Sequence, residues 1–168
     1  MPITETKRLR IDRATPTDAS FFLRLMNNPN WIRYIGDRGV VSEEHALEHI
    51  KSNLIKSYEE HGYGLYKMSL KSSDLPIGIC GFVKRDYLDH ADIGFAVLPE
   101  YEGKGFVFEA AQAVMAYGKN ALKLNPILAI TSRDNIRSKK LLLKIGLKEK
   151  STVTPPNDNE ELLLFSNE

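Results

Sequence analysis

Two glycines bracket a lysine in Gly103-Lys104-Gly105, where an alternating apolar stretch gives way to a helical pattern. Glycine lets the backbone approach a ligand closely, and the first turn of a helix adds unpaired N–H groups at the positive end of its dipole. Such a turn would bind an anion through main-chain amides, with the charge of Lys104 nearby. A Gly-x-Gly turn is also ordinary turn chemistry, and this one matches neither a Walker A nor a dinucleotide-binding sequence.

A second segment at a set distance strengthens the anion-site interpretation. Residues 131–149 read TSRDNIRSKKLLLKIGLKE, in which a strand end is followed by Asn135, by Ser138 three residues later, and by a helical pattern that ends at Gly146. Asn135 at a helix start is by default a capping residue.

The elements that must position these residues alternate along the chain, which is typical of a mixed α/β sheet with helices on its faces. Hydrophobic alternation and turn residues predict strands at 9–11, 62–71, 75–86, 91–99, 127–131, 147–154 and 162–165. Helical periodicity and start signals predict helices around 21–25, from Ser42 to about Glu59, from the glycine turn to about Lys119, and up to Gly146. Residues 28–39, NPNWIRYIGDRG, are expected to form a loop.

Length and composition indicate one compact domain over 1–168. The overall charge is too small to attract a charged partner by itself. The chain has 168 residues, of which 42% are hydrophobic, and its 23 basic and 22 acidic residues leave a net charge of +1. The overall charge therefore gives no reason to expect a nucleic-acid partner. No run approaches the ~20 apolar residues that a bilayer span needs, and no signal peptide is recognisable. The lone Cys80 suits a reducing compartment, so we expect a cytoplasmic protein.

Taken together, the two segments resemble the acyl-CoA-binding half of the GNAT N-acetyltransferase superfamily. The matching positions after the second strand are Asn135, Ser138, Lys144, Gly146 and Leu147. The opening TKRLRIDRATPTDASFFLRLMNNPNWIRYIG, residues 6–36, resembles the RimJ/RimL-like branch, the ribosomal-protein N-acetyltransferase type, so the likeness covers essentially the whole chain. The resemblance implies a GNAT fold, with a mixed, mostly antiparallel twisted sheet of about six to seven strands flanked by about four helices.

The resemblance also implies acetyl-CoA as cosubstrate, no metal, and a primary amine as acceptor, either a small molecule or a protein N-terminus. The cofactor-binding residues that it implies are Phe95, Ala96, Val97, Glu102, Gly103, Lys104, Gly105, Phe106, Val107, Phe108, Asn135, Ser138 and Lys144. Three positions depart from the usual pattern: Glu102 replaces Gln or Arg, Val107 replaces Gly or Ala, and Leu147 replaces an aromatic residue. At the position of Leu142, some members have a tyrosine that protonates the leaving thiolate. The resemblance therefore does not identify the residue that acts as general acid in this chain.

The chemistry that the resemblance implies is direct attack of a neutral amine on the thioester carbonyl, with a backbone N–H around Phe95 to Val97 stabilising the oxyanion. Asp92 and Ser138 are the candidate catalytic residues. Asp92 begins the strand near where some members carry a glutamate base, although an Asp there is also an ordinary strand end. Glu109 can instead complement the helix dipole.

The acceptor side is expected to involve Trp31, Arg33 and Tyr34, with aromatic rings beside a guanidinium that could anchor a carboxylate. Trp31 could equally pin its segment to the core. The most basic stretch could be a solvated helix face, a seat for the 3′-phosphate of CoA or a contact with ribosomal RNA; its members are Arg133, Arg137, Lys139, Lys140, Lys144, Lys148 and Lys150. The oligomeric state is left open between a monomer and a homodimer.

Two other functions compete with acetyl transfer. The segment HALEH, with His45, Glu48 and His49, matches the spacing of a metallopeptidase motif. Helical periodicity turns both histidines away from the apolar face, and a third ligand is missing. The second alternative is a non-catalytic acyl-CoA sensor, which keeps the fold but does not transfer the acyl group. The departures from the family pattern at Glu102, Val107 and Leu142 support this alternative.

Overall fold

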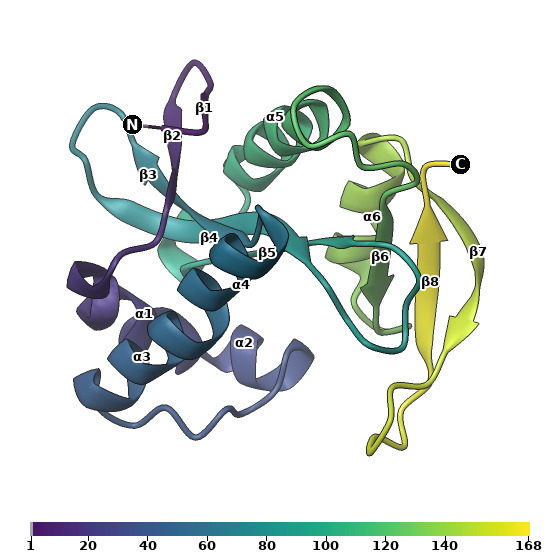
Figure 1. The fold of residues 1–168 in the computed structure, drawn as a ribbon, viewed down its shortest axis with the longest axis horizontal. Helices are drawn as coiled ribbons and strands as arrows, with labels where there is room; N and C mark the ends of the chain where they lie inside the picture. The colour runs from purple at the N-terminus through teal and green to yellow at the C-terminus, as the bar shows by residue number, and fades with distance from the viewer. Residues whose placement is uncertain (1) are drawn as a thin grey trace.

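The computed structural model describes residues 2–168 and contains one eight-stranded sheet in the order β1-β2-β3-β4-β5-β6-β8-β7 (Figure 1). Its strands are β1 (Thr4–Glu5), β2 (Leu9–Arg13), β3 (Leu65–Leu70), β4 (Pro76–Val83), β5 (Asp92–Val97), β6 (Leu128–Thr131), β7 (Lys148–Val153) and β8 (Leu162–Ser166). Its helices are α1 (Ala19–Met26), α2 (Pro29–Tyr34), α3 (Glu43–His49), α4 (Lys56–His61), α5 (Phe106–Asn120) and α6 (Ile136–Lys144), with a π-helical stretch at Ile50–Ile55 between α3 and α4.

The sheet is antiparallel except where β5 meets β6. These two strands run parallel, and they pair only at Asp92 and Leu128, near the start of each strand. On its other side β5 pairs with β4 without interruption from Asp92 to Val97. The carboxyl end of β5 therefore keeps one neighbour and loses the other, which leaves a splay between β5 and β6.

Helices cover the sheet in two groups. In Figure 1, α1 to α4 lie together below the sheet, α5 crosses above it, and α6 lies beside β6. The alternation that predicted the strands reflects this packing, because Leu9 and Ile11 of β2 are fully buried. The apolar face expected after Ser42 is also confirmed, with Ile50 and Leu54 in the core.

One expected loop is a helix. Residues 28–39 begin with α2, because the Asn28 side chain accepts hydrogen bonds from the amides of Asn30 and Trp31 and Pro29 occupies the first turn. Asn and Pro suit a helix start as well as a helix end. The prediction of a loop was therefore wrong for Pro29–Tyr34.

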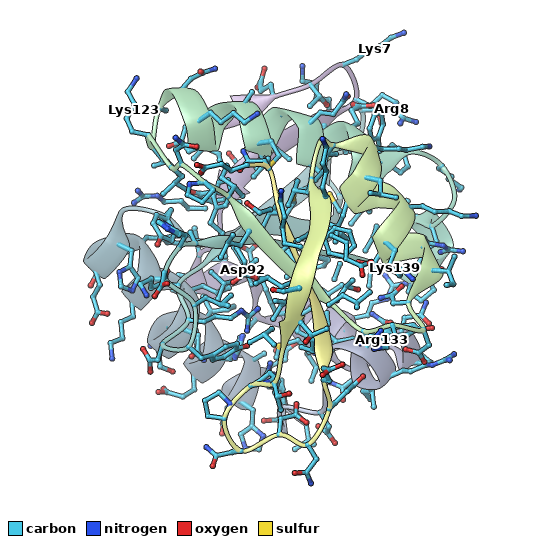
Figure 2. The ribbon with its side chains drawn as sticks, turned by 90° about the vertical axis from the view of Figure 1, so that its right-hand side faces the viewer. Lys7, Arg8, Asp92, Lys123, Arg133 and Lys139 are labelled. Atoms are coloured by element: carbon cyan, nitrogen blue, oxygen red, sulfur yellow. The ribbon has the colours of Figure 1, made fainter. Side chains whose placement is uncertain are left out.

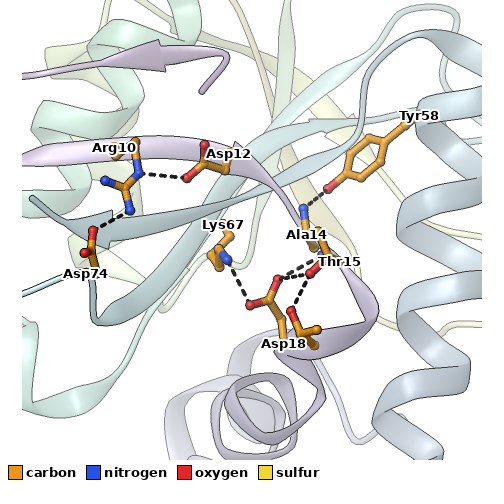
Figure 3. Close-up of polar contacts among 9 residues, drawn as sticks. Arg10, Asp12, Ala14, Thr15, Asp18, Tyr58, Lys67 and Asp74 are labelled. Carbon is orange, nitrogen blue, oxygen red and sulfur yellow. Dashed lines mark hydrogen bonds and ion pairs between the residues drawn. The ribbon is translucent and has the colours of Figure 1, made fainter. Parts of the chain in front are cut away.

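Buried polar contacts fasten the helical layer to the sheet where β2 turns into α1 (Figure 3). Asp18 accepts a hydrogen bond from the Thr15 amide at 2.8 Å and pairs with Lys67 of β3 at 2.9 Å. Nearby, the Tyr58 hydroxyl accepts the Ala14 amide at 3.0 Å and donates to the Leu65 carbonyl. Burial raises the pKa of Tyr58 to about 12, so the hydroxyl stays protonated and keeps both contacts.

A polar lock holds the N-terminal strands against the start of α5. Glu109, in the first turn of α5, accepts hydrogen bonds from the Thr6 hydroxyl, from the Arg8 amide at 3.0 Å and from Arg8 Nε at 2.8 Å. The Arg8 guanidinium also lies over the Phe106 ring, 4.2 Å from its centroid. Partial burial would raise the pKa of the Glu109 carboxyl, but the bonds from Thr6 and Arg8 outweigh it and hold that pKa below its usual value.

Glu109→Gln is expected to lower stability by about 1–2 kcal/mol, because charge-assisted hydrogen bonds to Thr6 and Arg8 are weakened. A carboxylate whose folded pKa is depressed stabilises the protein above its unfolded pKa, and that stabilisation is lost as pH falls through the folded value. Thermal melts should therefore separate the variant from the wild type at pH 7 and bring them together as the pH falls below the folded pKa of Glu109. Glu60→Gln is the control, since Glu60 forms only long surface pairs, with Lys56 at 3.8 Å and with His61 at 3.9 Å. An E109Q deficit that persisted unchanged in acid would contradict the lock.

Candidate functional site

The segment that links β5 to α5 exposes backbone donors. Gly103 and Gly105 have φ angles of 72° and 80°, in the left-handed region that glycine adopts without strain. Gly105 is the N-cap of α5 and offers no side-chain cap, whereas α2, α3 and α6 each begin with a capping side chain. The first amides of α5, from Phe106 to Phe108, have no helical partner by geometry. This uncapped start is what an anion site requires.

Further donors lie along the carboxyl half of β5. The Leu98 amide bonds to Ile77 of β4, and the Ala91 carbonyl accepts a bond from Leu128 of β6. Because backbone groups alternate in direction along a strand, the amides of Phe95 and Val97 point toward the β6 side and that of Ala96 toward β4. Beyond Asp92, no β6 residue pairs with β5. The amides of Phe95 and Val97 therefore face the splay.

The start of α6 borders the same splay. Asn135 caps α6, since its side-chain oxygen accepts the Ser138 amide at 3.2 Å. Ser138 is half-buried in the first turn of this helix. In the last turn, the Lys144 ammonium lies 5.5 Å from the Phe108 ring centroid and links α6 to α5. The capping role expected of Asn135 is thus present in the structure.

Glu102, which departs from the family pattern, has two partners from distant elements. Its carboxylate accepts a hydrogen bond from Asn30 of α2 at 2.6 Å and pairs with Arg137 of α6 at 2.7 Å. The Arg137 guanidinium offsets the negative charge that Glu102 brings to a loop suited to anions. The residue also joins α2, the glycine loop and α6 at one point.

Asp92 lies inside the molecule, away from the splayed end of β5 (Figure 2). Its side chain is 1% exposed and pairs with Arg85 at 2.8 Å. Burial raises the pKa of the Asp92 carboxyl above its usual value, and the Arg85 guanidinium acts in the opposite direction. At about 3.3 Å per strand residue, Asp92 is roughly 10 Å from Phe95. Its geometry is that of one half of a buried ion pair.

The expected acceptor residues are partly brought to the site. Trp31 is 6% exposed, which fits a residue that anchors α2 to the core. Arg33 stacks on Tyr34, with 4.7 Å from its guanidinium carbon to the ring centroid, and reaches Asp134 at 3.4 Å. With the Asn30 contact to Glu102, these interactions place α2 against both the glycine loop and the segment that follows β6.

The other predicted groups are dispersed. In Figure 2 Lys139 extends from α6, and Arg133 lies lower on the molecule, where it pairs with Glu161 at 2.5 Å. His45 is exposed, and His49 contacts Asn53 at 3.0 Å. Across residues 2–168, no group of three or more His, Cys, Asp or Glu side chains is placed to hold a metal ion. Within the same residues, no helix is long and apolar enough to cross a membrane.

Several contacts of the site escaped sequence reasoning. Arg85, the partner of Asp92, lies in an irregular segment with no pattern to mark it. Arg8 was visible only as part of the N-terminal resemblance, and its contact with Glu109 spans 101 residues. Asn30 and Arg137 meet at Glu102 from 72 and 35 residues away. Contacts of this range depend on the tertiary fold rather than on local spacing.

Comparison with known proteins identifies the family. A protein-family model, that of the acetyltransferase (GNAT) domain, matches residues 8–148, which is most of the chain. The chain belongs to the GNAT family of N-acetyltransferases. GNAT enzymes use acetyl-CoA. The resemblance in the glycine loop and in the Asn135–Leu147 segment is therefore confirmed at the level of family and enzyme class.

Two relatives of this GNAT chain come from Bacillus subtilis. The chain is 30% identical over 154 residues to the uncharacterized N-acetyltransferase YoaA of Bacillus subtilis, covering 90% of this chain and 86% of the relative. YnaD, another uncharacterized N-acetyltransferase of that species, is 31% identical over 143 residues, with 85% and 81% covered.

Solved structures confirm the predicted fold class. RimL, a ribosomal L7/L12 α-N-protein acetyltransferase in complex with coenzyme A, superposes with a TM-score of 0.84 at 16% identity, covering 99% of this chain and 97% of that one. The ribosomal-protein-S5-alanine acetyltransferase of Vibrio fischeri gives 0.80 at 17%, with 97% and 94% covered. The observed sheet has eight strands rather than six or seven, because the short β1 was not anticipated.

Asp92→Asn is expected to lower the free energy of unfolding by about 2–4 kcal/mol, because it leaves the half-buried Arg85 charge without its partner. Arg85→Gln should do the same from the other side. Urea denaturation of both single variants and of the double variant measures the coupling. The double variant should be no less stable than the worse single variant. Strictly additive losses would show that the pair is not the source of the stability.

Proposed function

We propose that this GNAT protein transfers the acetyl group of acetyl-CoA to a primary amine, with the cofactor bound across the splay between β5 and β6. The observation that carries the proposal is the uncapped, glycine-lined start of α5 directly beyond the splayed end of β5. Anions are favoured at such a helix start by its free amides and its dipole. The diphosphate of CoA supplies the anion, and the rest of the molecule then extends toward β5.

In this proposal the cofactor is held mostly by main chain. The amides of Gly103 to Phe108 receive the diphosphate, and the exposed Lys104 adds its charge. Asn135, Ser138 and Lys144 form the opposite border on α6. Glu102 does not prevent binding, because Arg137 and Asn30 already engage its carboxylate. The bound pantetheine would take the place on the β6 side of β5 where strand pairing stops.

The chemistry follows from the same placement. The amine nitrogen attacks the thioester carbonyl carbon, and the oxyanion that forms is stabilised by an amide of β5, with Phe95 and Val97 as the donors that face the splay. Collapse of the intermediate breaks the carbon–sulfur bond. The thiolate leaves and takes up a proton, since the pKa of the thiol is ~8.5, while the amine loses a proton. Holding both reactants together supplies much of the acceleration.

Proton transfer is assigned to two groups. Ser138, in the first turn of α6, is the proposed donor to the leaving thiolate. Asp92 is the proposed base; its raised pKa suits that role, but at about 10 Å from Phe95 it needs a chain of water molecules to reach the amine. Its ion pair with Arg85 also supports a purely structural role.

The acceptor is proposed to enter on the α2 side, along Trp31, Arg33 and Tyr34. The contacts of α2 with Glu102 and Asp134 support this side, since they bring the helix next to the splay. Two structural relatives are described as ribosomal-protein acetyltransferases, which favours a protein N-terminus over other amines. A screen of amino acids, polyamines and peptides with acetyl-CoA, read by mass shift, identifies the acceptor.

A non-catalytic acyl-CoA sensor is the second candidate. Leu142 is 1% exposed in the core at the position where some superfamily members carry a tyrosine acid, so no side-chain acid is available there. Ser138 is the side-chain donor proposed in its place. Calorimetric binding of CoA without thiol release with any amine of the screen would favour the sensor.

Gly105→Val is expected to abolish CoA binding in calorimetry, because a branched side chain at the start of α5 would occupy the space of the diphosphate. Gly62→Val is a matched control. Gly62 has a similar φ of 77° at the end of α4, remote from the loop, so both variants should lose roughly 1–2 kcal/mol of stability from the left-handed conformation. Only the variant at Gly105 should lose CoA. Retained affinity in Gly105→Val would remove the loop from the site.

A further inference from the structure

A cavity of about 470 Å³ lies beside the first residue of α5. It is lined by Lys7, Arg8, Leu70, Lys71, Ser72 and Phe106, and we call it the basic cavity. These residues come from the turn between β1 and β2, from the end of β3 with the turn that follows it, and from the start of α5. The Lys71 amide donates to the Arg8 carbonyl at 2.9 Å, which holds the two turns together. Of the lining residues, only Phe106 is also proposed to bind the cofactor.

The lining of the basic cavity keeps a positive charge. Lys7 forms no ion pair with the residues that the structure describes, 2–168. Lys71 pairs with Glu5 at 3.5 Å, and because both side chains are exposed this pair contributes little. Arg8 is paired with Glu109. Three cationic groups and two carboxylates therefore leave a net positive charge around the cavity.

Arg8 is held firmly while part of its guanidinium stays free. Its Nε donates to Glu109 at 2.8 Å, and its guanidinium carbon lies 4.2 Å from the centroid of the Phe106 ring. The two terminal nitrogens of Arg8 donate to no atom within residues 2–168. One of them, Nη2, lies 3.5 Å from the point where a Cβ atom would lie at Gly105. A guanidinium fixed on one edge and free on the other is preorganised to bind an oxyanion.

The donors around the basic cavity favour a phosphate group over a carboxylate. The Arg8 guanidinium and the two lysine ammonium groups only donate, and the Ser72 hydroxyl can donate as well. A phosphate monoester has three strong acceptor oxygens, so it can use donors from several sides, whereas a carboxylate has two. Leu70 and Phe106 add apolar surface. The volume lies within the ~300–1,000 Å³ that is typical of sites for organic ligands, which suits a phosphate ester.

We propose that the basic cavity binds the phosphate group of a phosphate monoester, with Arg8, Lys7 and Lys71 as its partners. Two sources carry such a group: the 3′-phosphate of CoA, reached from a diphosphate at the neighbouring Gly105, and a free phosphate ester. The first source rests on the proposed function, because it requires the diphosphate on the glycine loop, and the second does not. In both cases Glu109 is a positioning residue, since it fixes the guanidinium of Arg8.

The test uses a double variant, Lys7→Ala with Lys71→Ala, which removes two cations and leaves Arg8 and Glu109 in place. Both lysines are exposed, so the variant should fold, and thermal melting checks that it does. The matched control is Lys139→Ala with Lys140→Ala, in the basic stretch of α6. Figure 2 shows Lys139 well apart from Lys7 and Arg8, which lie together at one end of the molecule.

Two measurements distinguish the sources of the phosphate. Calorimetry gives the Kd of CoA and of 3′-dephospho-CoA for the wild type and both double variants. Thermal melts compare sodium phosphate with sodium chloride at equal ionic strength, so that screening is the same in both.

If the 3′-phosphate of CoA occupies the cavity, the wild type should bind CoA about 10-fold more tightly than 3′-dephospho-CoA, the effect of one charge-assisted hydrogen bond. This preference should vanish without Lys7 and Lys71 and persist in the α6 variant. If a free ester is the ligand, the wild type should bind both coenzymes equally. Phosphate should then raise the Tm of the wild type and of the α6 variant above the value in chloride, and the Lys7/Lys71 variant should show no such rise.

The proposal is overturned if neither the coenzyme preference nor the stabilisation by phosphate depends on Lys7 and Lys71. A preference that is lost only in the α6 variant, with no rise in Tm in phosphate, would also overturn it and would place the 3′-phosphate on α6. If the wild type binds neither coenzyme, the proposed function fails instead. The melts in phosphate still decide whether the cavity binds phosphate, so the two failures are distinguishable.

Discussion

The site depends on unsatisfied backbone donors that are kept in place by the fold. Pairing between β5 and β6 stops after Asp92 and Leu128, and α5 begins at Gly105 without a capping side chain. Main-chain N–H groups are strong donors that seldom remain unpaired in a folded protein. A row of them, made by Phe95 and Val97 in β5 and by Phe106 to Phe108 at the start of α5, is therefore stable only if a ligand or solvent pairs with it. That requirement suits an extended, anionic molecule such as acetyl-CoA.

Neighbouring contacts fix this row without using its donors. Glu109 ties the start of α5 to Thr6 and Arg8, Lys144 reaches Phe108 from α6, and Glu102 connects the loop to α2 and α6. All of these are made by side chains on the flanks of the loop. The proposed binding by main chain is compatible with Glu102, since the side chain at that position contacts Asn30 and Arg137 instead.

The sequence predicted the secondary structure around this site better than the interactions of its side chains. The strand before Gly103, the helix after it and the Asn135 cap follow from local periodicity and turn chemistry, which act over a few residues. The helix from Pro29 was missed because Asn28 and Pro29 suit either a helix end or a helix start. The pairing of Asp92 with Arg85 could not be predicted, because Arg85 lies in an irregular segment. The burial of Asp92 beside this guanidinium is visible only in the folded structure.

Whether main-chain amides at the start of α5 hold coenzyme A can be measured by following amide resonances during a titration with CoA. The largest NMR shifts, in ¹H–¹⁵N spectra of the labelled protein, are expected at Gly103 to Phe108. Smaller shifts should reach Phe95 and Val97 in β5. Unmoved loop amides, with shifts confined to the lysines of α6 or to another face, would contradict binding by these amides.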